Sequence, residues 1–316
     1  MRSAILKGAL DLAALSIVRL LVLAMEVTPE FLGMCIARIC VHGLVLAMPR
    51  SRRVALRNLK IAFPECSSEE GNDIYRRSLE VLARNLYAFA RMPRLTRRAA
   101  EEKVDYGEVR EFWRRSSEVC EEDCSKTGIL VATAHYGCFE LFVQMHALLV
   151  RPISILARGF DLPRLDSWCN ERRSIFGNDV FSRKGGYREI VSRLNGGRDV
   201  VVLCDQNVKR NHATFVDFFG LRAATTKAIG TAALRTGARV VLAVAVEIVP
   251  ERFEVILREL KNPRELSGNS SEKIMSFTRE MNQALEDVIR QHPEQWFWVH
   301  RRWKTRPHGE KENLYS

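Results

Sequence analysis

The chain has 316 residues, of which 47% are hydrophobic and 28% are charged. This balance is ordinary for a folded protein and excludes an intrinsically disordered chain. The excess of 49 Lys and Arg over 38 Asp and Glu gives a net charge of +11. Such a charge favours anionic partners, whether anionic lipid, an acidic protein or nucleic acid, and does not choose among them.

Two apolar stretches open the chain, at about residues 10–25 and 31–48. Ionic side chains interrupt them, including Asp11 and Arg19 in the first. An arginine near the centre of a bilayer would cost roughly 2.5–3.5 kcal/mol, and each stretch is barely long enough to span. We therefore expect residues 1–50 to form an N-terminal membrane anchor or interfacial helices. The alternative is a pair of buried helices in a soluble protein.

Residues 51–127 predict a charged, helical lead-in. Ser67 and Glu70 have the spacing of a capping box, in which each side chain bonds the other residue's backbone N–H. The helix that they begin is expected to run to about Met92.

The eight cysteines are scattered along the chain and predict free thiols in a reducing compartment. Cys120 and Cys124 have no second Cys or His pair nearby, which disfavours a zinc site. We expect no bound metal.

From residue 128 the pattern changes to buried strands that alternate with helices. Apolar runs predict strands at residues 129–134, 153–157, 200–204 and 240–249, with helical patterns at 139–149, 187–194 and 227–236. A turn at Pro250 and Glu251 predicts an antiparallel hairpin at one edge of the sheet. The predicted fold class is α/β, a mixed, mostly parallel sheet flanked by helices over residues 128–307. A polar tail follows at 308–316.

The segment that carries His135 is the most informative in the chain. A buried strand delivers His135 to its C-terminal end, where ligands bind in open α/β sheets. Gly137 permits a turn, and Glu140 then falls in the first turn of a helix. A histidine beside a carboxylate can act as a general base, so His135 and Glu140 are predicted catalytic residues. A purely structural histidine is the alternative, and Cys138 is a weaker candidate nucleophile.

Later strand and helix ends add candidate substrate-binding residues. Asp205 and Gln206 end one buried strand, and Arg158 follows another in a position to hold a phosphate. Thr225 or Thr226 is predicted to cap the next helix, whose N-terminus would suit an anion. A solvated or structural role is the alternative for each.

Four blocks of sequence together resemble the lauroyl/myristoyl acyltransferase family of lipid A biosynthesis. They are Arg57-Asn-Leu with Phe63-Pro-Glu, His135-Tyr-Gly-Cys-Phe-Glu140, Asp205-Gln with Phe218-Phe-Gly and Ala224-Thr-Thr, and the aromatic, basic segment from Pro293 to Pro307. The resemblance covers roughly residues 55–307. It implies a glycerolipid-acyltransferase-like fold and an enzyme at the cytoplasmic face of a Gram-negative inner membrane.

The same resemblance implies an acyl carrier protein thioester as donor and an anionic lipid A precursor as acceptor, without a cofactor. His135 would be the base and Glu140 its partner, with direct transfer in a ternary complex. Basic clusters at residues 52–60, 91–98 and 301–306 are candidates for contacts with these anions. The sequence contains no nucleic-acid motif, and nucleic acid is not expected as a partner.

Other acceptors remain open, namely a glycolipid, an aminolipid or a lysophospholipid. A glycerophospholipid acyltransferase would carry a Phe-Pro-Glu-Gly block downstream of the histidine, whereas Phe63-Pro-Glu here lies upstream and lacks the Gly. A non-catalytic membrane protein of this fold is the alternative of a different class.

Overall fold

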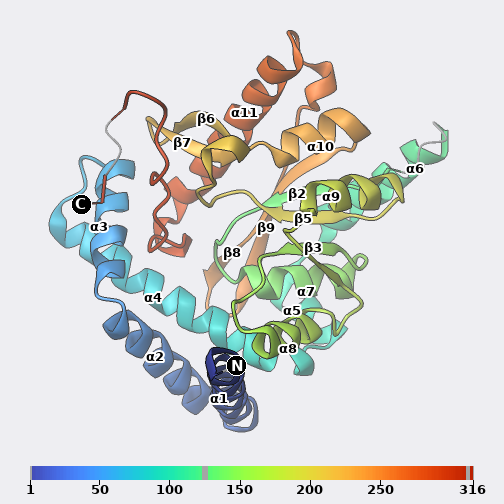
Figure 1. The fold of residues 1–316 in the computed structure, drawn as a ribbon. Helices are drawn as coiled ribbons and strands as arrows, with labels where there is room; N and C mark the ends of the chain where they lie inside the picture. Colours follow the sequence, from blue (N-terminus) through green and yellow to red (C-terminus); the bar gives the residue numbers. More distant parts are fainter. Residues whose placement is uncertain (1, 123–126, 311–313, 316) are drawn as a thin grey trace.

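A seven-stranded sheet forms the centre of the computed structural model, which describes residues 2–122, 127–310 and 314–315 (Figure 1). Its strands lie in the order β1-β9-β8-β2-β5-β3-β4. Neighbours are parallel, except for the antiparallel pair β8 and β9. The strands are β1 (Val104–Asp105), β2 (Leu130–Thr133), β3 (Ser154–Ala157), β4 (Asp179–Ser182), β5 (Val200–Leu203), β8 (Val240–Val249) and β9 (Arg252–Leu260); β6 (Ala213–Phe218) and β7 (Leu221–Thr226) form a separate antiparallel pair.

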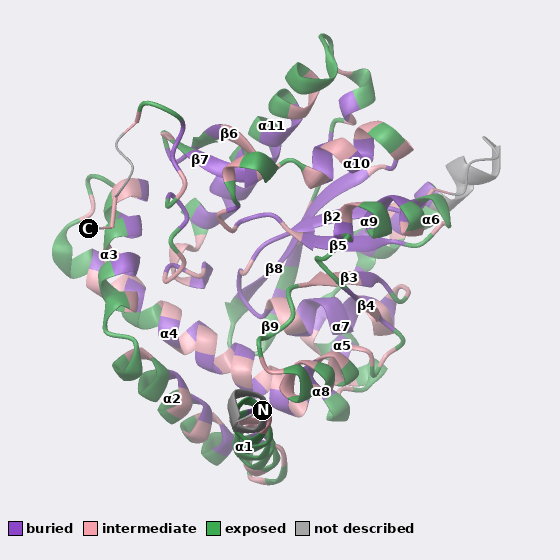
Figure 2. Ribbon diagram, viewed as in Figure 1, coloured by how far each residue is buried: buried purple, intermediate pink, exposed green. Residues whose placement is uncertain are grey.

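Helices cover both faces of this sheet, which confirms the predicted fold class. Leu130 and Ala132 of β2 pack in one cluster with α9, α10 and α11, whereas Val131 packs in another with α6 and α7. Burial on both faces explains why the central strands β2, β5 and β8 are continuous apolar runs, and Figure 2 shows these strands mostly buried. The α-helices are α1 (Arg2–Val27), α2 (Glu30–Ala47), α3 (Arg50–Ala62), α4 (Ser68–Arg91), α5 (Arg97–Lys103), α6 (Gly107–Glu122), α7 (Phe139–Leu149), α8 (Pro163–Arg173), α9 (Gly186–Asn195), α10 (Ala228–Thr236) and α11 (Ser270–Gln291).

The predicted capping box is present, and a second one begins α11. Ser67 and Glu70 begin α4, and Asn269 and Glu272 begin α11, each pair with reciprocal side-chain and backbone hydrogen bonds. Short 3-10 turns lie at Met92–Arg94, Arg210–His212, Pro263–Glu265 and Pro293–Gln295.

The sheet differs from expectation at one edge. The hairpin of β8 and β9 is antiparallel as predicted, but β1 pairs with β9 and lies beyond it. The predicted helical lead-in at 51–127 therefore contains a strand, and its Val104 side chain is buried in the same cluster as Ala100 of α5 and Val109 of α6. A two-residue strand leaves too short a pattern to be recognised in the sequence.

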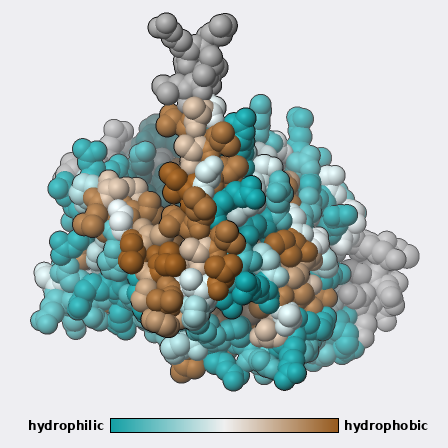
Figure 3. All heavy atoms as spheres, turned by 90° about the horizontal axis from the view of Figure 1, so that it is seen from below, coloured by the Kyte–Doolittle hydropathy of each residue, from teal (hydrophilic) through white to brown (hydrophobic). Residues whose placement is uncertain are grey.

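The N-terminal helices expose their apolar side chains. Both α1 and α2 are long and apolar enough to cross a membrane, and only 17% of each apolar window is buried. Leu20, Ile39 and Leu46 are more than half exposed. Figure 3, which views the molecule from the side of these helices, shows apolar side chains gathered on this face. The two helices are consistent with an anchor.

Asp11 is an exception within α1, because its carboxylate is buried against the rest of the protein. It accepts hydrogen bonds from the backbone N–H groups of Arg164, at 3.0 Å, and Leu165, at 3.4 Å. These N–H groups belong to the first turn of α8 and have no partner within their own helix. A carboxylate at a helix N-terminus is also favoured by the helix dipole. Asp11 therefore docks α1 onto α8.

The polar tail is partly tied to the body. The Tyr315 hydroxyl donates to Oδ1 of Asn58 at 2.7 Å and accepts from the backbone N–H of Trp303 at 3.0 Å. Residues 311–313 and 316 lie outside the described residues, as does Cys124; the side chain of Cys120 is also not described.

Substitution of His146 tests the packing of α7 beneath the sheet. Burial lowers the pKa of His146 to about 4 from 6.5. Between these values the unfolded chain binds a proton that the folded protein does not, so acidification from pH 6.5 to 4 lowers the free energy of unfolding, by about 3 kcal/mol from this group. We expect His146→Phe in detergent to lose less thermal stability than the wild type between pH 7.5 and 4.5. Equal losses of thermal stability in the variant and the wild type would contradict the assignment of this pH dependence to His146.

Candidate active site

The turn between β2 and α7 positions His135 at the carboxyl edge of the sheet. Gly137 makes this turn with a φ of +51°, and a Cβ on it would lie 2.5 Å from the carbonyl oxygen of Ala245. Glycine is therefore required here both by the left-handed backbone and by the close approach of β8. Asn85 of α4 donates to the Gly137 carbonyl at 2.6 Å.

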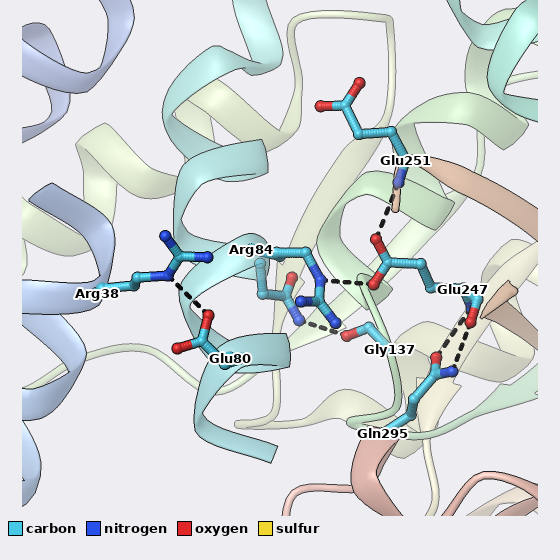
Figure 4. Close-up of polar contacts among 8 residues, drawn as sticks. Arg38, Glu80, Arg84, Gly137, Glu247, Glu251 and Gln295 are labelled. Carbon is cyan, nitrogen blue, oxygen red and sulfur yellow. Dashed lines mark hydrogen bonds and ion pairs between the residues drawn. The ribbon is translucent and has the colours of Figure 1, made fainter. Parts of the chain in front are cut away.

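The C-terminal segment holds the other side of the same turn. Phe297 N–H donates to the carbonyl of His135 at 3.1 Å, and Gly137 N–H donates to the carbonyl of Gln295 at 2.8 Å. The amide side chain of Gln295 in turn bonds both backbone groups of Glu247 (Figure 4). The turn is thus fixed from three directions, by α4, β8 and the C-terminal segment.

Asp205 is the carboxylate that contacts His135. Its Oδ1 lies 2.9 Å from Nδ1 of the ring, and its Oδ2 accepts from the backbone N–H of His135 at 3.0 Å. Because a carboxylate only accepts hydrogen bonds, this contact assigns the ring proton to Nδ1 and leaves the lone pair on Nε2. The side-chain nitrogen of Gln206 lies 3.2 Å from Nε2.

The surroundings of Asp205 keep it ionised. Its side chain is buried, and burial alone would raise its pKa, but the charge and hydrogen bonds of His135 and the indole N–H of Trp296 lower the pKa below its usual value. The Trp296 bond is 3.0 Å long. A buried, ionised carboxylate on Nδ1 is the arrangement that orients a histidine base and stabilises its protonated form.

Glu140 was expected to contact His135, but it does not. Its carboxylate forms an ion pair with Arg173, the last residue of α8, with hydrogen bonds from both Nε and Nη2 of the guanidinium. Glu140 does lie in the first turn of α7, as predicted, and it lines the same cavity as His135. The partner of the histidine comes instead from the neighbouring parallel strand β5.

A cavity of about 920 Å³ opens beside His135 at this edge of the sheet. Apolar side chains from α7, β3 and β5 form part of its wall, among them Phe139, Ile155 and Val201. Arg158 and Gln206, two of the predicted substrate-binding residues, also line it. Asp205 contacts His135 but is not among the residues that line the cavity.

Thr225, a predicted substrate-binding residue, lies away from the cavity. It is fully buried in β7, where its hydroxyl accepts from Arg302 at 2.6 Å, and it does not line the cavity. The helix cap is Lys227, while the hydroxyl of Thr226 accepts from the N–H of Ala228. The threonine pair ends strand β7, and its first member is committed to packing.

The basic C-terminal cluster is also partly structural. Arg302 is fully buried, its guanidinium donates to the carbonyl of Ala224, and burial lowers its pKa to about 10. Arg306 is buried and donates to the carbonyl of Arg222. These two side chains hold β7 against the C-terminal segment and are not available to an anionic partner.

Cys138 is buried, and burial raises the pKa of its thiol to about 12. A thiol of that pKa is not a nucleophile at neutral pH. Among the residues that the structure describes, no cluster of three or more His, Cys, Asp or Glu side chains could hold a metal ion.

Arg173, Arg183 and Arg188 line the cavity, and the sequence did not single them out. Arg173 lies at the end of a charged, partly buried helix rather than after a buried strand, so no pattern marked it. Asp205, by contrast, carried a usable signal as partner of His135. His135 and Asp205 both follow apolar strands, and neighbouring parallel strands bring their carboxyl ends to the same edge of the sheet.

His135, oriented by the buried Asp205, lies at the carboxyl edge of a mostly parallel α/β sheet and beside a partly apolar cavity, an arrangement in which a histidine can act as a base. The family comparison identifies the reaction class. A family model described as bacterial lipid A biosynthesis acyltransferase matches residues 8–305, and the chain belongs to this family. It is therefore an acyltransferase.

Individual relatives agree with this assignment. The chain is 27% identical over 265 residues to the lipid A biosynthesis myristoyltransferase of Escherichia coli (strain K12), covering 82% of this chain and 77% of that protein. It is 26% identical over 279 residues to the lipid A biosynthesis lauroyltransferase of the same organism, covering 83% and 82%. Lipid A biosynthesis acyltransferase 2 of Shigella flexneri is 25% identical over 269 residues, covering 83% and 81%.

Substitution of Gly137 tests how the turn positions His135. Gly137→Ala combines a left-handed backbone with a clash against Ala245, whereas Gly220→Ala has a similar φ of +70° but no atom within 4 Å of its Cβ. Backbone strain alone costs about 1–3 kcal/mol, so the clash should make Gly137→Ala the less stable variant. We expect it also to lower acyl transfer at least tenfold, with Gly220→Ala near the wild-type rate. Equal effects on melting temperature and rate would refute the steric argument.

Proposed function

We propose that this chain transfers a fatty acyl group from the thioester of an acyl carrier protein to a hydroxyl group of a lipid A precursor, with His135 as general base. One observation carries the proposal: Nδ1 of His135 contacts Asp205, and His135 lines the partly apolar cavity. Membership of the lipid A acyltransferase family supports the acceptor class.

In the proposed step, Nε2 of His135 removes the proton of the acceptor hydroxyl as its oxygen attacks the thioester carbonyl carbon. The new C–O bond forms, the C–S bond breaks, and the thiolate leaves with the proton returned from the imidazolium. The acceptor hydroxyl would replace the amide of Gln206, which lies 3.2 Å from Nε2. The buried Cys138 offers no nucleophile, so direct transfer in a ternary complex is the simplest route.

Asp205 is the proposed positioning residue for this base. Its carboxylate holds the Nδ1 proton and offsets the charge of the imidazolium. Glu140 takes a different part from the one that the sequence suggested: its ion pair fixes Arg173 in the cavity wall. The apolar part of the wall is the proposed place for the acyl chain.

Membrane attachment through α1 and α2 is part of the proposal. The exposed apolar side chains of both helices support it, as does a lipid acceptor. We propose the inner membrane, with the α/β body on the cytoplasmic side, where acyl carrier protein thioesters are made. A glycolipid, aminolipid or lysophospholipid acceptor is the alternative.

The first test is acyl transfer by His135→Ala in membranes that contain the full chain. Carrier-protein thioesters of several chain lengths serve as donors, and a tetra-acylated, sugar-bearing lipid A precursor is compared with the alternative acceptors by mass spectrometry. Loss of a general base lowers rates about 10²–10⁴-fold. We expect a loss of this size in His135→Ala and none in His308→Ala, an exposed histidine that does not line the cavity. Undiminished transfer by His135→Ala would rule out the proposed base.

The second test compares Asp205→Asn with Glu140→Gln. An asparagine can hold His135 in the wrong tautomer, so we expect Asp205→Asn to lower kcat about 10³–10⁴-fold, by analogy with the serine-protease triad. Glu140→Gln breaks the ion pair with Arg173, and we expect it to act at least tenfold less on kcat. The reverse order of effects would assign the partner of the base to Glu140.

A further inference from the structure

The cavity carries a set of cations that the proposed acyl transfer does not use. Four cationic side chains make up this set, and within the described part of the chain none of them has an ion pair or a side-chain hydrogen bond. Glu140 is the one carboxylate among the described residues that line the cavity, and Arg173 already neutralises it. The cavity therefore keeps an excess of positive charge, which favours an anionic ligand. The four cations are Arg158, Arg183, Arg188 and Lys227.

The register of the sheet brings two of these cations together. In the parallel pair β3 and β4, Ala157 lies opposite Ser182, and the N–H of Arg183 donates to the carbonyl of Ala157 at 3.2 Å. Arg158 and Arg183 are the next residues, so they leave the sheet side by side at its carboxyl edge. Burial and the charge of Arg158 lower the pKa of Arg183 below its usual value. An anion between the two guanidinium groups would relieve this repulsion.

The backbone beside Arg183 adds to the same field. Gly185 and Gly186 line the cavity and begin α9 without a side-chain cap. The N–H groups of Gly186 and Arg188 already donate to the carbonyls of Arg183 and Gly185, each at 3.0 Å, so the helix contributes chiefly through its dipole, which favours negative charge at this end.

We propose that Arg158 and Arg183 form a subsite that binds a phosphate group of a substrate, with Arg188 and Lys227 at its margin. Guanidinium groups suit phosphate because their paired N–H donors match its oxygens. The inference rests on the proposed function, in which both a phosphorylated lipid acceptor and the phosphopantetheine arm of the carrier protein bring phosphate to the site. Adjacent strands lie about 4.8 Å apart, which puts the subsite about 10–15 Å from His135 along the sheet edge.

Phosphate binding is tested first, without any acyl transfer. ³¹P NMR line broadening of two probes, 4′-phosphopantetheine and glucosamine 1-phosphate, is measured with the full chain in detergent micelles. We expect the wild type to broaden at least one probe, and the double variant Arg158→Gln/Arg183→Gln to reduce that broadening at least fivefold. Arg183→Lys in place of Arg183→Gln should restore part of it, because a cation remains.

Two variants serve as controls for this measurement. Arg279→Gln removes an exposed arginine of α11 that does not line the cavity, and it should broaden the probes as the wild type does. His135→Ala should also retain binding. The phosphate subsite can therefore stand even if the proposed base fails, and it can fail while the base stands. Absence of broadening for both probes, or equal broadening by the double variant, would overturn the subsite.

Steady-state kinetics then identifies the source of the phosphate. The acceptor is used with and without its phosphate groups, and the donor as a carrier-protein thioester or as an N-acetylcysteamine thioester, which has no phosphate. We expect the double variant to raise KM about tenfold or more for the phosphate-bearing form of one substrate, with kcat little changed. For the phosphate-free form of that substrate, the variant and the wild type should have the same KM. An equal rise for both forms would contradict phosphate recognition.

Discussion

The parallel pairing of β2 with β5 is the constraint on which the site depends. Thr133 lies opposite Leu203, and the N–H of Cys204 continues the ladder to the carbonyl of Thr133 at 2.8 Å. His135 and Asp205 each follow two residues beyond these paired positions, so the register alone brings imidazole and carboxylate together. The pairing of β3 with β4 repeats this effect with Arg158 and Arg183.

A second layer of contacts keeps the residues after β2 from relaxing. Asn85 of α4 and the backbone of Gln295 bond the turn on either side of His135, and Trp296 bonds Asp205. Asn58 of α3 also holds the C-terminal segment, because its side-chain amide donates at 2.7 Å to the carbonyls of Trp298 and His300. Segments from both ends of the chain thus hold this edge of the sheet in one geometry.

The N-terminal helices are joined to the same edge through α8. Asp11 of α1 bonds the first turn of α8, and Arg173 at the other end of α8 pairs with Glu140 in the cavity wall. These contacts give the exposed apolar face of α1 and α2 a fixed relation to the cavity.

Local patterns in the sequence were enough to predict β2, β3, β5 and the hairpin of β8 and β9, the capped start of α4, the family resemblance and the place of His135 after a buried strand. They did not reveal β1, β4, β6 or β7. Nor did they reveal which side chains meet, because such contacts join segments far apart in the chain. Spacing along the chain favoured Glu140 as the partner of His135, but the turn at Gly137 and the ion pair with Arg173 direct it elsewhere. Asp205 takes that position, since a carboxylate 70 residues away reaches the ring only through strand pairing.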